Sequence, residues 1–380
     1  MNLAEIPSPC YVIEERLLRK NLEQIRYVKN EAGVNIILAF KGFALWKSFP
    51  ILNEYGFNEA TASSLNEAKL AYEEMGAPAH TYSVVYDEAE FNEIMNYSSF
   101  ITFNSIAQFD KYIPLITDGA KDISVGLRIN PEFSQVSTDL YNPCSPGSRL
   151  GVVRSSLPDE LPRAIQGLHV HALCESSSFD LEKLLHSIKS KFHTHLLQVK
   201  WLNLGGGHLM TRKDYNLEHL IQVLKAFRQE YPHLQLILEP GSAFAWETGF
   251  LVSRIMDITN NSGIKTAILD VSFTAHMPDC LEMPYKPKIR NAYHEAVVGK
   301  PTYRMGGNSC LSGDFIGDWS FDSDLNIGDH IIFEDMIHYT MVKTSYFNGV
   351  KHPSIGMIKL NNEFNLFRSF TYLDYKNKLS

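Results

Sequence analysis

The stretch Val34-Asn-Ile-Ile-Leu-Ala-Phe40-Lys41-Gly42 is an apolar run followed by a lysine and a glycine. Such a run is typical of a strand buried on both faces, as in a parallel sheet. A lysine at the end of a buried strand is costly to desolvate unless it has a partner or a chemical task. The task that fits is condensation with an aldehyde, which needs a desolvated amine with a lowered pKa. The alternative is a side chain that only reaches from the strand end to solvent.

Apolar runs like this one recur along the chain and alternate with amphipathic segments. The runs are 35–41, 57–63, 80–85, 100–104, 123–130, 165–173, 201–205 and 235–239. Helical periodicity predicts helices over 64–75, 88–96, 106–116, 181–197 and 217–231, whereas 130–148 is predicted to be a loop. The repeated strand–helix pattern favours an α/β (β/α)8 TIM barrel, with an open doubly wound sheet as the alternative.

The pattern changes after about residue 246. Strand-like segments separated by turn residues are found at 251–258, 266–271, 294–298, 302–305, 330–333 and 354–359. They predict a C-terminal antiparallel β domain, a barrel or a sandwich. A first strand over 10–13 is considered as a partner of the barrel sheet, although residues 1–19 are grouped with the β domain. The expected domains are therefore 20–245 for the barrel and 1–19 with 246–380 for the β domain.

Composition excludes several classes of function. The 380 residues carry a net charge of −8 with no basic stripe, which argues against binding of nucleic acid. No stretch approaches the length of a membrane span, and the N-terminus lacks the pattern of a signal peptide. The five cysteines are widely spaced without a CxxC pair, which argues against disulfides and a structural zinc site. These features predict a cytoplasmic protein.

In a barrel of this kind, functional residues gather at the carboxyl ends of the strands. The predicted strand ends carry Lys41, Arg128, His169, Gly205, Gly206, Gly207, Glu239 and Gly241. A triple glycine lets backbone N–H groups approach an anion, and barrels commonly bind phosphate after strands seven and eight. Glu239 is costly to bury unless it meets a cation or a ring N–H, such as the pyridinium of pyridoxal phosphate.

Each of these features has a plain alternative when it is taken singly. The glycines can form a tight turn, Glu239 a buried salt bridge, and His169 a satisfied core histidine. His169 and His171 share a strand face, so a metal site is a further alternative, although no third ligand in a suitable context follows. Together, the amine, the glycines and the carboxylate match the aldehyde, phosphate and ring nitrogen of one molecule of pyridoxal phosphate.

In this combination of residues the chain resembles the fold-type III pyridoxal-phosphate decarboxylases, which include the ornithine, diaminopimelate and carboxynorspermidine enzymes. The resemblance covers nearly the whole chain and implies an alanine racemase-like barrel with a β domain. The motifs that carry it are Ala39-Phe-Lys41-Gly42, Leu168-His-Val170, Gly205-Gly-Gly207, Glu239-Pro-Gly241, Ser309-Cys310-Leu-Ser-Gly-Asp314 and Phe333-Glu-Asp-Met-Ile-His-Tyr339.

The resemblance implies a role for each matching residue. Lys41 would hold the cofactor covalently, His169 would stack on its ring, and Glu239 would pair with its nitrogen. The implied cofactor-binding set is completed by Arg128 and, around the phosphate, by Gly205, Gly206, Gly207, Gly241 and Tyr339. Cys310 would reach across the interface of a homodimer with shared active sites and return a proton to the substrate carbon.

Segment 60–67, Gly205-Gly-Gly-His208 and His276-Met-Pro-Asp279 are most similar to the carboxynorspermidine (carboxyspermidine) decarboxylases. That similarity implies a cationic polyamine-type substrate and a place in spermidine biosynthesis. Asp279 would bind the distal amine, and Glu175, Glu282 and Asp314 are further carboxylates expected near the barrel mouth.

Two departures from the family pattern matter. Ser242 stands where the ornithine and diaminopimelate enzymes usually have Arg, which counts against a substrate with a second carboxylate. Ile337-His338 replaces the Gly-Ala expected before the phosphate tyrosine, so the backbone at Tyr339 is less well defined by the pattern.

Several alternatives stay open. One is decarboxylation of another basic or diamino acid, such as ornithine or diaminopimelate. Another is a non-catalytic carrier of pyridoxal phosphate, against which the β domain and Cys310 argue. Carboxynorspermidine and carboxyspermidine differ by one methylene, worth only about 1–3 kcal/mol in a pocket, so the sequence does not separate them. It also assigns no function to His171 or His208.

Overall fold

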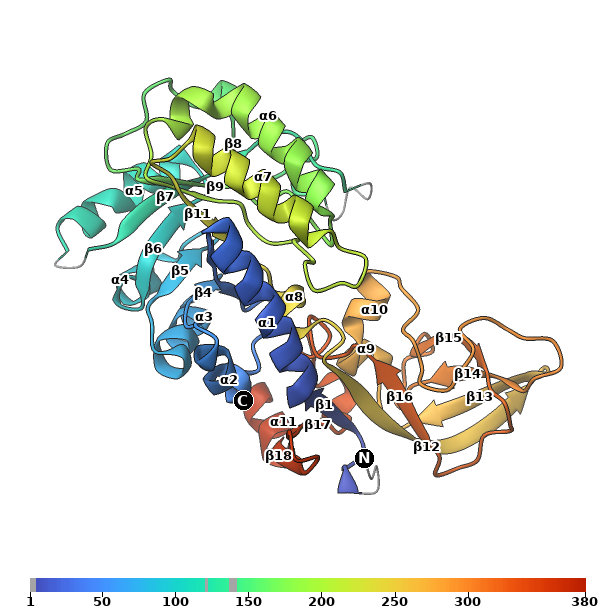
Figure 1. The fold of residues 1–380 in the computed structure, drawn as a ribbon. Coiled ribbons are helices and arrows are strands. Elements are labelled where there is room, and N and C mark those ends of the chain that lie inside the picture. The colour runs from blue at the N-terminus through green and yellow to red at the C-terminus, as the bar shows by residue number, and fades with distance from the viewer. Residues whose placement is uncertain (1–4, 120–121, 137–141) are drawn as a thin grey trace. The chain divides into compact units, whose positions relative to one another are not determined.

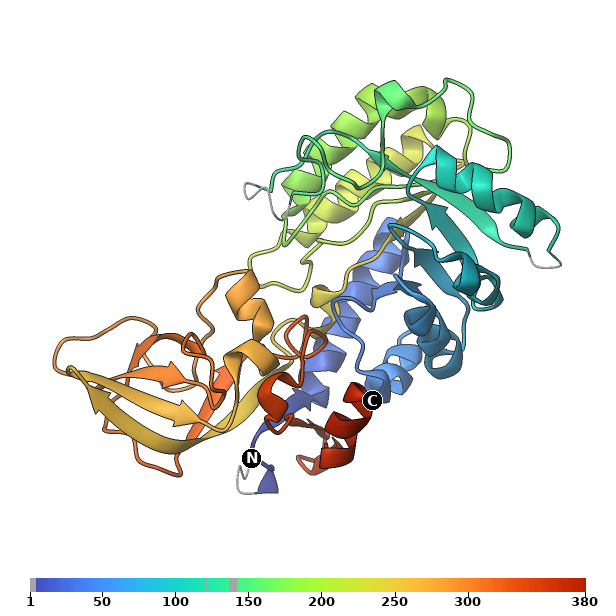
Figure 2. The same ribbon diagram turned by 180° about the vertical axis from the view of Figure 1, so that it is seen from behind.

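The computed structural model describes residues 5–119, 122–136 and 142–380, and the chain divides into two compact units (Figure 1, Figure 2). One unit is Asn21–Phe244, and the other combines Met1–Lys20 with Ala245–Ser380. The first unit contains a parallel sheet with helices outside it, and the second contains a separate mixed sheet.

The unit Asn21–Phe244 is a (β/α)8 barrel, as predicted. In the described residues its strands are β2 (Asn35–Ile36), β3 (Leu38–Ala39), β4 (Ala60–Ala62), β5 (Ala79–Tyr82), β6 (Ser98–Phe103), β7 (Ser124–Asn130), β8 (Val152–Val153), β9 (Gly167–His169), β10 (Trp201–Asn203) and β11 (Gln235–Leu238). The strands pair in parallel, and β2 and β3 are two halves of one strand interrupted at Ile37. The sheet closes because β2 pairs with β11 while β3 pairs with β4.

Helices precede, connect and follow the barrel strands. They are α1 (Glu15–Ala32), α2 (Phe49–Glu54), α3 (Leu65–Leu70), α4 (Glu88–Asn96), α5 (Ile106–Thr117), α6 (Ser178–Leu196), α7 (Leu217–Glu230) and α8 (Ser242–Ala245). Ser64 caps α3 by accepting a hydrogen bond from the Glu67 N–H at 3.2 Å, at the spacing that the sequence predicts. The segment after β7 lacks a helix in its described residues, as predicted, and 137–141 of that predicted loop lie outside them.

Trp201 fills the end of the barrel at which the strands begin. Trp201 packs with Ile37 and Ile237, and its indole N–H donates to Ser124 at 2.8 Å. A Cβ at Gly167 would lie 1.9 Å from the indole ring. A Cβ at Gly126, on β7, would lie 2.3 Å from the same ring. Strands β7 and β9 therefore need glycine beside Trp201, because protein cores hold no spare volume.

The unit made of Met1–Lys20 and Ala245–Ser380 is built on a second sheet. In the described residues its strands are β1 (Cys10–Glu14), β12 (Gly249–Asn261), β13 (Ile264–Leu269), β14 (Thr302–Gly306), β15 (Phe315–Ser320), β16 (His330–Glu334), β17 (Ser354–Ile358) and β18 (Phe364–Arg368). Their order is β15-β14-β13-β12-β1-β17-β18, with β16 also paired to β12. Short helices complete the unit: α9 (Phe273–His276), α10 (Pro278–Glu282) and α11 (Tyr372–Leu379).

Three expectations about this unit need correction. The sheet is mixed rather than purely antiparallel, because β1 pairs in parallel with β17 and β13 pairs in parallel with β14. Strand β1 belongs to this sheet, between β12 and β17, and not to the barrel. The segment 294–298 is not a strand, while β15 and β18 were not predicted. Val298, in that segment, is fully exposed, so its apolar character reflects no buried face.

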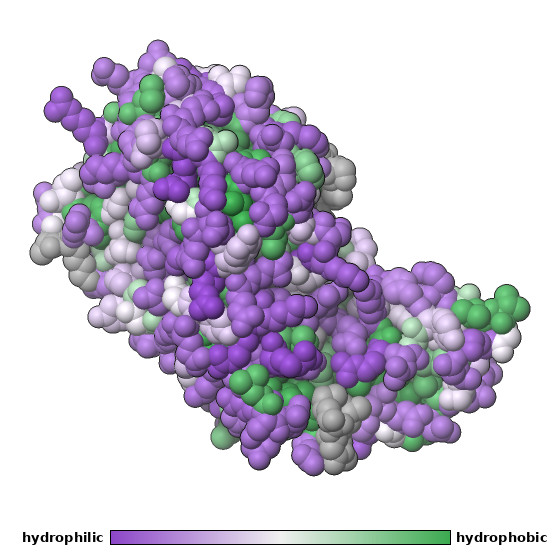
Figure 3. Space-filling view, viewed as in Figure 1, coloured by the Kyte–Doolittle hydropathy of each residue, from purple (hydrophilic) through white to green (hydrophobic). Residues whose placement is uncertain are grey.

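The face of the molecule drawn in Figure 3 is mostly hydrophilic, with apolar side chains in small scattered groups. Among the residues that the structure describes, no helix combines the length and the apolar character needed to cross a membrane.

Candidate active site

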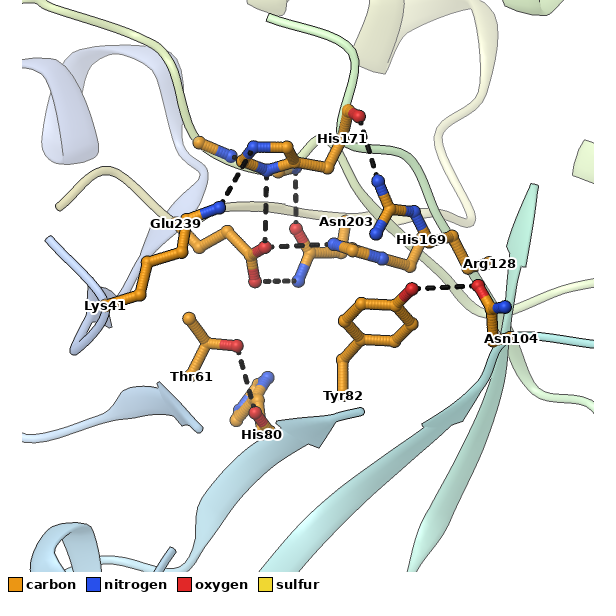
Figure 4. A network of polar contacts seen from close by, with 12 residues as sticks. Lys41, Thr61, His80, Tyr82, Asn104, Arg128, His169, His171, Asn203 and Glu239 are labelled. Atoms are coloured by element: carbon orange, nitrogen blue, oxygen red, sulfur yellow. Dashed lines mark hydrogen bonds and ion pairs between the residues drawn. The ribbon is translucent and has the colours of Figure 1, made fainter. Parts of the chain in front are cut away.

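Polar side chains converge at the carboxyl ends of the barrel strands (Figure 4). Lys41 follows β3, His171 follows β9, and Glu239 follows β11. The Lys41 Nζ lies 3.4 Å from His171 Nε2, and Glu239 Oε1 lies 3.8 Å from Nδ1 of the same ring. The predicted amine and the predicted carboxylate are thus separated by the width of one imidazole.

Glu239 is buried and uses both carboxylate oxygens. Oε1 lies 2.9 Å from His169 Nε2, and Oε2 accepts from Asn203 Nδ2 at 3.0 Å. Burial alone would raise the pKa of Glu239, but His169, Asn203 and Lys41 hold that pKa at about 2. Glu239 is therefore a carboxylate at neutral pH, and it can accept a further hydrogen bond from a ring N–H.

His169 is neutral at physiological pH, because burial lowers its pKa more strongly than Glu239 raises it. Since Nε2 faces the carboxylate and donates to it, the lone pair of the neutral ring lies on Nδ1. Nδ1 is buried and has no hydrogen-bond partner within the described residues.

The amine of Lys41 has a pKa below that of an ordinary lysine. The side chain is accessible to solvent, yet its nitrogen lies among His171, Arg128 and Glu239. Loss of hydration among these side chains lowers the pKa of Lys41, although the negative charge of Glu239 raises it. The positive charge of Arg128 lowers the pKa further. A larger fraction of uncharged amine at neutral pH follows, as attack on an aldehyde requires.

Arg128 on β7 supports the site from one side. Its Nη2 donates to the backbone carbonyl of His171 at 3.1 Å, and its guanidinium lies 4.8 Å from the centroid of the Tyr82 ring. The Tyr82 hydroxyl donates to Asn104 Oδ1 at 2.8 Å. This buried cation fixes the backbone at His171, and its contact with the cofactor stays a prediction.

The loops around the site pass each other at backbone distance. A Cβ at Gly205 would lie 2.4 Å from the Val170 carbonyl, and one at Gly207 would lie 2.3 Å from the Leu173 carbonyl. Both glycines have positive φ, 72° and 84°. Side chains at these positions would therefore both strain the backbone and block the approach of the loops.

Gly241 makes a similar close approach on the other side of the site. A Cβ on Gly241 would lie 3.0 Å from Gly42 Cα, so the loops after β3 and β11 touch. The Gly205 and Gly206 N–H groups donate to Asn203 Oδ1 at 2.8 Å and His171 Nδ1 at 3.0 Å. Phosphate binding by this loop therefore stays a prediction.

These residues fit pyridoxal phosphate. The unpartnered Nδ1 of His169, the ionised carboxylate of Glu239 and the Lys41 amine of lowered pKa lie at the same ends of the barrel strands. The adjacent glycine loop has no room for side chains at Gly205 and Gly207. Within the described residues, no group of three or more His, Cys, Asp or Glu side chains is arranged to hold a metal ion.

The carboxylates predicted to bind substrate have different environments. Glu175, beyond β9, has a left-handed backbone with φ 46°, and its carbonyl accepts from Arg212 at 3.2 Å. In the second unit, Asp314 is buried and accepts from the N–H groups of Ser309 and Thr274, each at 3.1 Å. Asp314 therefore organises its own loop, which leaves its carboxylate less able to bind a substrate amine.

Asp279 and Glu282 converge on a cation that the sequence did not single out. Lys343 Nζ lies 2.9 Å from Asp279 Oδ1 and also forms an ion pair with Glu282. Burial alone would lower the pKa of Lys343, but the two carboxylates raise it above its usual value. Asp279 and Glu282 thus form one cluster with a lysine ammonium, and their binding of a substrate amine stays a prediction.

Cys310 and Tyr339 also lie in the second unit. Cys310 is exposed, and its backbone N–H donates to Asn348 Oδ1 at 3.0 Å. Tyr339 has φ 41°, a left-handed conformation that is rare for a tyrosine and follows the Ile337-His338 departure noted in the sequence. Their roles in proton return and phosphate binding stay predictions.

Sequence reasoning missed Asn203, Tyr82 and Lys343. Asn203 is the last residue of β10, and a stricter reading of strand ends would have found it. Tyr82 likewise ends β5. Lys343 lies in an irregular segment, and only its contacts reveal it.

The chain is similar to several known proteins. The profile of the family described as "Pyridoxal-dependent decarboxylase, C-terminal sheet domain" matches residues 10–337. The chain is 51% identical over 377 residues to carboxyaminopropylagmatine decarboxylase of Synechocystis, covering 99% of this chain and 96% of the relative. It is 42% identical to carboxynorspermidine/carboxyspermidine decarboxylase of Campylobacter jejuni, covering 98% of both chains.

A solved structure shows the same similarity. Carboxynorspermidine decarboxylase of Campylobacter jejuni, complexed with norspermidine, superposes with a TM-score of 0.90 at 40% identity, covering 98% of this chain and 100% of that one.

Proposed function

Because the chain belongs to the pyridoxal-dependent decarboxylase family, we propose that it decarboxylates a carboxylated polyamine, with carboxynorspermidine and carboxyspermidine as leading substrates. The observation that carries the proposal is the pairing of Lys41 and Glu239 on either side of one imidazole. Whole-chain identity to decarboxylases of such substrates, and not only to amino-acid decarboxylases, supports the substrate class.

Bound pyridoxal phosphate supplies an aldehyde for amines and a ring that accepts the electron pair left by departing carbon dioxide. Lys41 would hold the cofactor through its amine, and the amine of the substrate would take the place of Lys41. Glu239, ionised at neutral pH, would accept a hydrogen bond from the ring nitrogen and so keep a proton there. His169 would face the ring, and the Gly205–Gly207 loop with Gly241 and Tyr339 would hold the phosphate.

Other residues would act on the substrate. Cys310, exposed on its loop, would return a proton to the carbon that loses carbon dioxide. Asp279 and Glu282 would supply negative charge for the distal amines, which matches a substrate whose far end is cationic. Ser242, in place of arginine, leaves no cation there for a second carboxylate, which disfavours diaminopimelate.

A second candidate substrate is carboxyaminopropylagmatine, because the relative that acts on it shares 51% identity with this chain. This compound ends in a guanidinium, whereas carboxynorspermidine and carboxyspermidine end in a primary ammonium. A guanidinium binds a carboxylate through two parallel hydrogen bonds, and an ammonium acts as a point charge. The same acidic cluster could serve either group.

The deciding experiment is a substrate panel. Purified protein with pyridoxal phosphate is incubated separately with carboxynorspermidine, carboxyspermidine, carboxyaminopropylagmatine, ornithine and diaminopimelate, and products are identified by mass. We expect loss of carbon dioxide from at least one of the three polyamine acids, with kcat/KM at least about 100-fold above the short amino acids. Lys41→Ala is the control and should abolish both the visible absorbance of the bound cofactor and turnover. Turnover of diaminopimelate alone would contradict the proposal.

A further inference from the structure

His171 lies between the amine of Lys41 and the triple-glycine loop (Figure 4). Its ring is mostly enclosed, with 19% of the side chain exposed. The Gly206 N–H donates to Nδ1 at 3.0 Å, and Nε2 lies 3.4 Å from Lys41 Nζ. Each ring nitrogen therefore has a defined neighbour.

The first contact determines where the ring proton is. A nitrogen that accepts a hydrogen bond must present its lone pair, so Nδ1 carries no proton. A neutral imidazole has one N–H, and it must then be on Nε2. Nε2–H is a donor, and Lys41 Nζ can accept from it only as an uncharged amine with a free lone pair.

The other possible arrangements conflict with the contacts. A charged Lys41 ammonium would place its own N–H groups against Nε2–H. A charged imidazolium would place a second N–H, on Nδ1, against the Gly206 N–H. Burial is the largest influence on the pKa of His171 and, together with the charge of Arg128, holds that pKa well below its usual value, which agrees with a neutral ring.

The charges that face this pair come from several elements. Arg128 on β7 opposes a charged amine at Lys41, whereas Glu239, Cys174 and Glu67 favour it. His169 and His208 face the imidazole of His171 and oppose its protonation, whereas Glu239 Oε1, 3.8 Å from Nδ1, favours it. Because these influences partly cancel at Lys41, a directed hydrogen bond to the amine can decide its state.

We propose that His171 is a positioning residue for Lys41: the Gly206 N–H fixes its proton on Nε2, and Nε2–H holds the lysine amine uncharged and aimed for attachment of the cofactor. The proposal takes from the proposed function only the assignment of Lys41 as the cofactor-binding amine. It gives the triple glycine a second task, because a backbone N–H of that loop sets the state of the amine.

Two substitutions separate the hydrogen bond from simple shielding of the amine. His171→Leu introduces an apolar side chain that still excludes water, and it removes Nε2–H. His171→Gln places an amide N–H near the position of Nε2. Both variants keep the backbone carbonyl that accepts from Arg128. Circular dichroism melting checks that each variant is folded, and His171→Phe replaces His171→Leu if the leucine variant is not.

The test measures the reactivity of Lys41 in full-length protein freed of cofactor. The protein is pulsed with formaldehyde and cyanoborohydride between about pH 6 and pH 11, a range that spans a lowered and an ordinary lysine pKa. Mass spectrometry compares labelling of Lys41 with that of the exposed Lys47 in the same molecules. In His171→Leu we expect labelling of Lys41 near neutral pH to fall about tenfold and to recover at high pH, because one pKa unit changes the uncharged fraction about tenfold. His171→Gln should stay within about threefold of the parent protein.

The rate at which added pyridoxal phosphate develops visible absorbance provides a second measurement and should fall in parallel in His171→Leu. Unchanged Lys41 labelling in the folded leucine variant overturns the proposal, since shielding alone would then suffice. Equal losses in the leucine and glutamine variants also overturn it, since the N–H would then be irrelevant. A parent protein that never binds pyridoxal phosphate would instead contradict the proposed function, while the labelling comparison would still report on His171.

Discussion

Lys343 joins the two carboxylates that sequence reasoning assigned to the substrate, Asp279 and Glu282. Its ammonium neutralises part of their charge, so it weakens the field that would attract a cationic polyamine. We predict that Lys343→Met lowers KM by about three- to tenfold for the carboxylated polyamine that serves as substrate, with a smaller effect on kcat. The measurement is steady-state kinetics at low ionic strength, where charge effects are largest.

The matched control for this prediction is Lys351→Met, which makes the same charge change at an exposed site of the same unit. It should leave KM within experimental error of the parent. A rise of KM in Lys343→Met would show instead that Lys343 keeps Asp279 in place, because a buried carboxylate that loses its cation is costly.

At the level of single residues, position in a strand was sufficient to predict part of the site. Lys41, His169 and Glu239 follow from reading the ends of apolar runs, since parallel strands bring those ends together. The hydrogen-bond partners could not be predicted in this way. That Glu239 pairs with His169 and Asn203 depends on side-chain directions in the closed barrel, and the local sequence does not define them.

Among the elements, the contact between β9 and β10 has no room for added volume at Gly167. Gly167 and Trp201 are paired residues of these strands, and the indole occupies the space of a Cβ at Gly167. Gly167→Ala is expected to lower the free energy of unfolding by about 1–3 kcal/mol, because overpacking displaces the indole. Urea melts give the value. Gly313→Ala, where an added Cβ meets no atom within 4 Å, serves as the control and should be near neutral.

A carboxylate at the starting ends of the barrel strands, Glu59, makes stability depend on pH. Glu59 lies 3.5 Å from His80, accepts from Asn35 at 2.8 Å, and has a pKa lowered to about 2, chiefly by His80. A carboxyl whose folded pKa lies below its unfolded value stabilises the fold above the unfolded pKa and loses this effect as pH falls toward the folded one. The window therefore runs from about pH 4.5 down to about pH 2.

Glu59→Gln should lower the free energy of unfolding at pH 7 by about 1–2 kcal/mol, less than the full linkage value because the side chain is 35% exposed. The difference between parent and variant should shrink as pH falls through that window, since a protonated glutamate resembles glutamine. Urea melts at several pH values test both statements. A constant difference at every pH would mean that the effect comes from packing.

Prediction of the elements succeeded where the signal is local and failed where it is not. Helix α4 was predicted at its observed limits, Glu88–Asn96, because its periodicity and its Asp87 cap are neighbours in sequence. The partners of β1 could not be predicted, because β12 and β17 lie more than two hundred residues away. Segment 294–298 has strand-like composition, but four of its five residues are exposed, and the pattern alone does not reveal this.

On the scale of the whole molecule, the fold class and the family were predicted correctly, and the assembly stays a prediction. The resemblance predicts a homodimer in which Cys310 of one copy serves Lys41 of the other. If so, Lys41→Ala and Cys310→Ala damage different halves of each shared site. A heterodimer of the two variants then contains one site with both residues intact and one with neither, as two-fold symmetry requires.

Each variant alone should be strongly impaired. After the two are mixed in equal amounts and allowed to exchange subunits, activity should rise to about a quarter of the parent value, since half of the dimers are mixed and each has one intact site. Mixing Lys41→Ala with itself at twice the concentration is the control and should restore nothing. If both residues of each site come from one copy, every site in the mixture carries one of the two substitutions, and activity should stay at the average of the two separate variants.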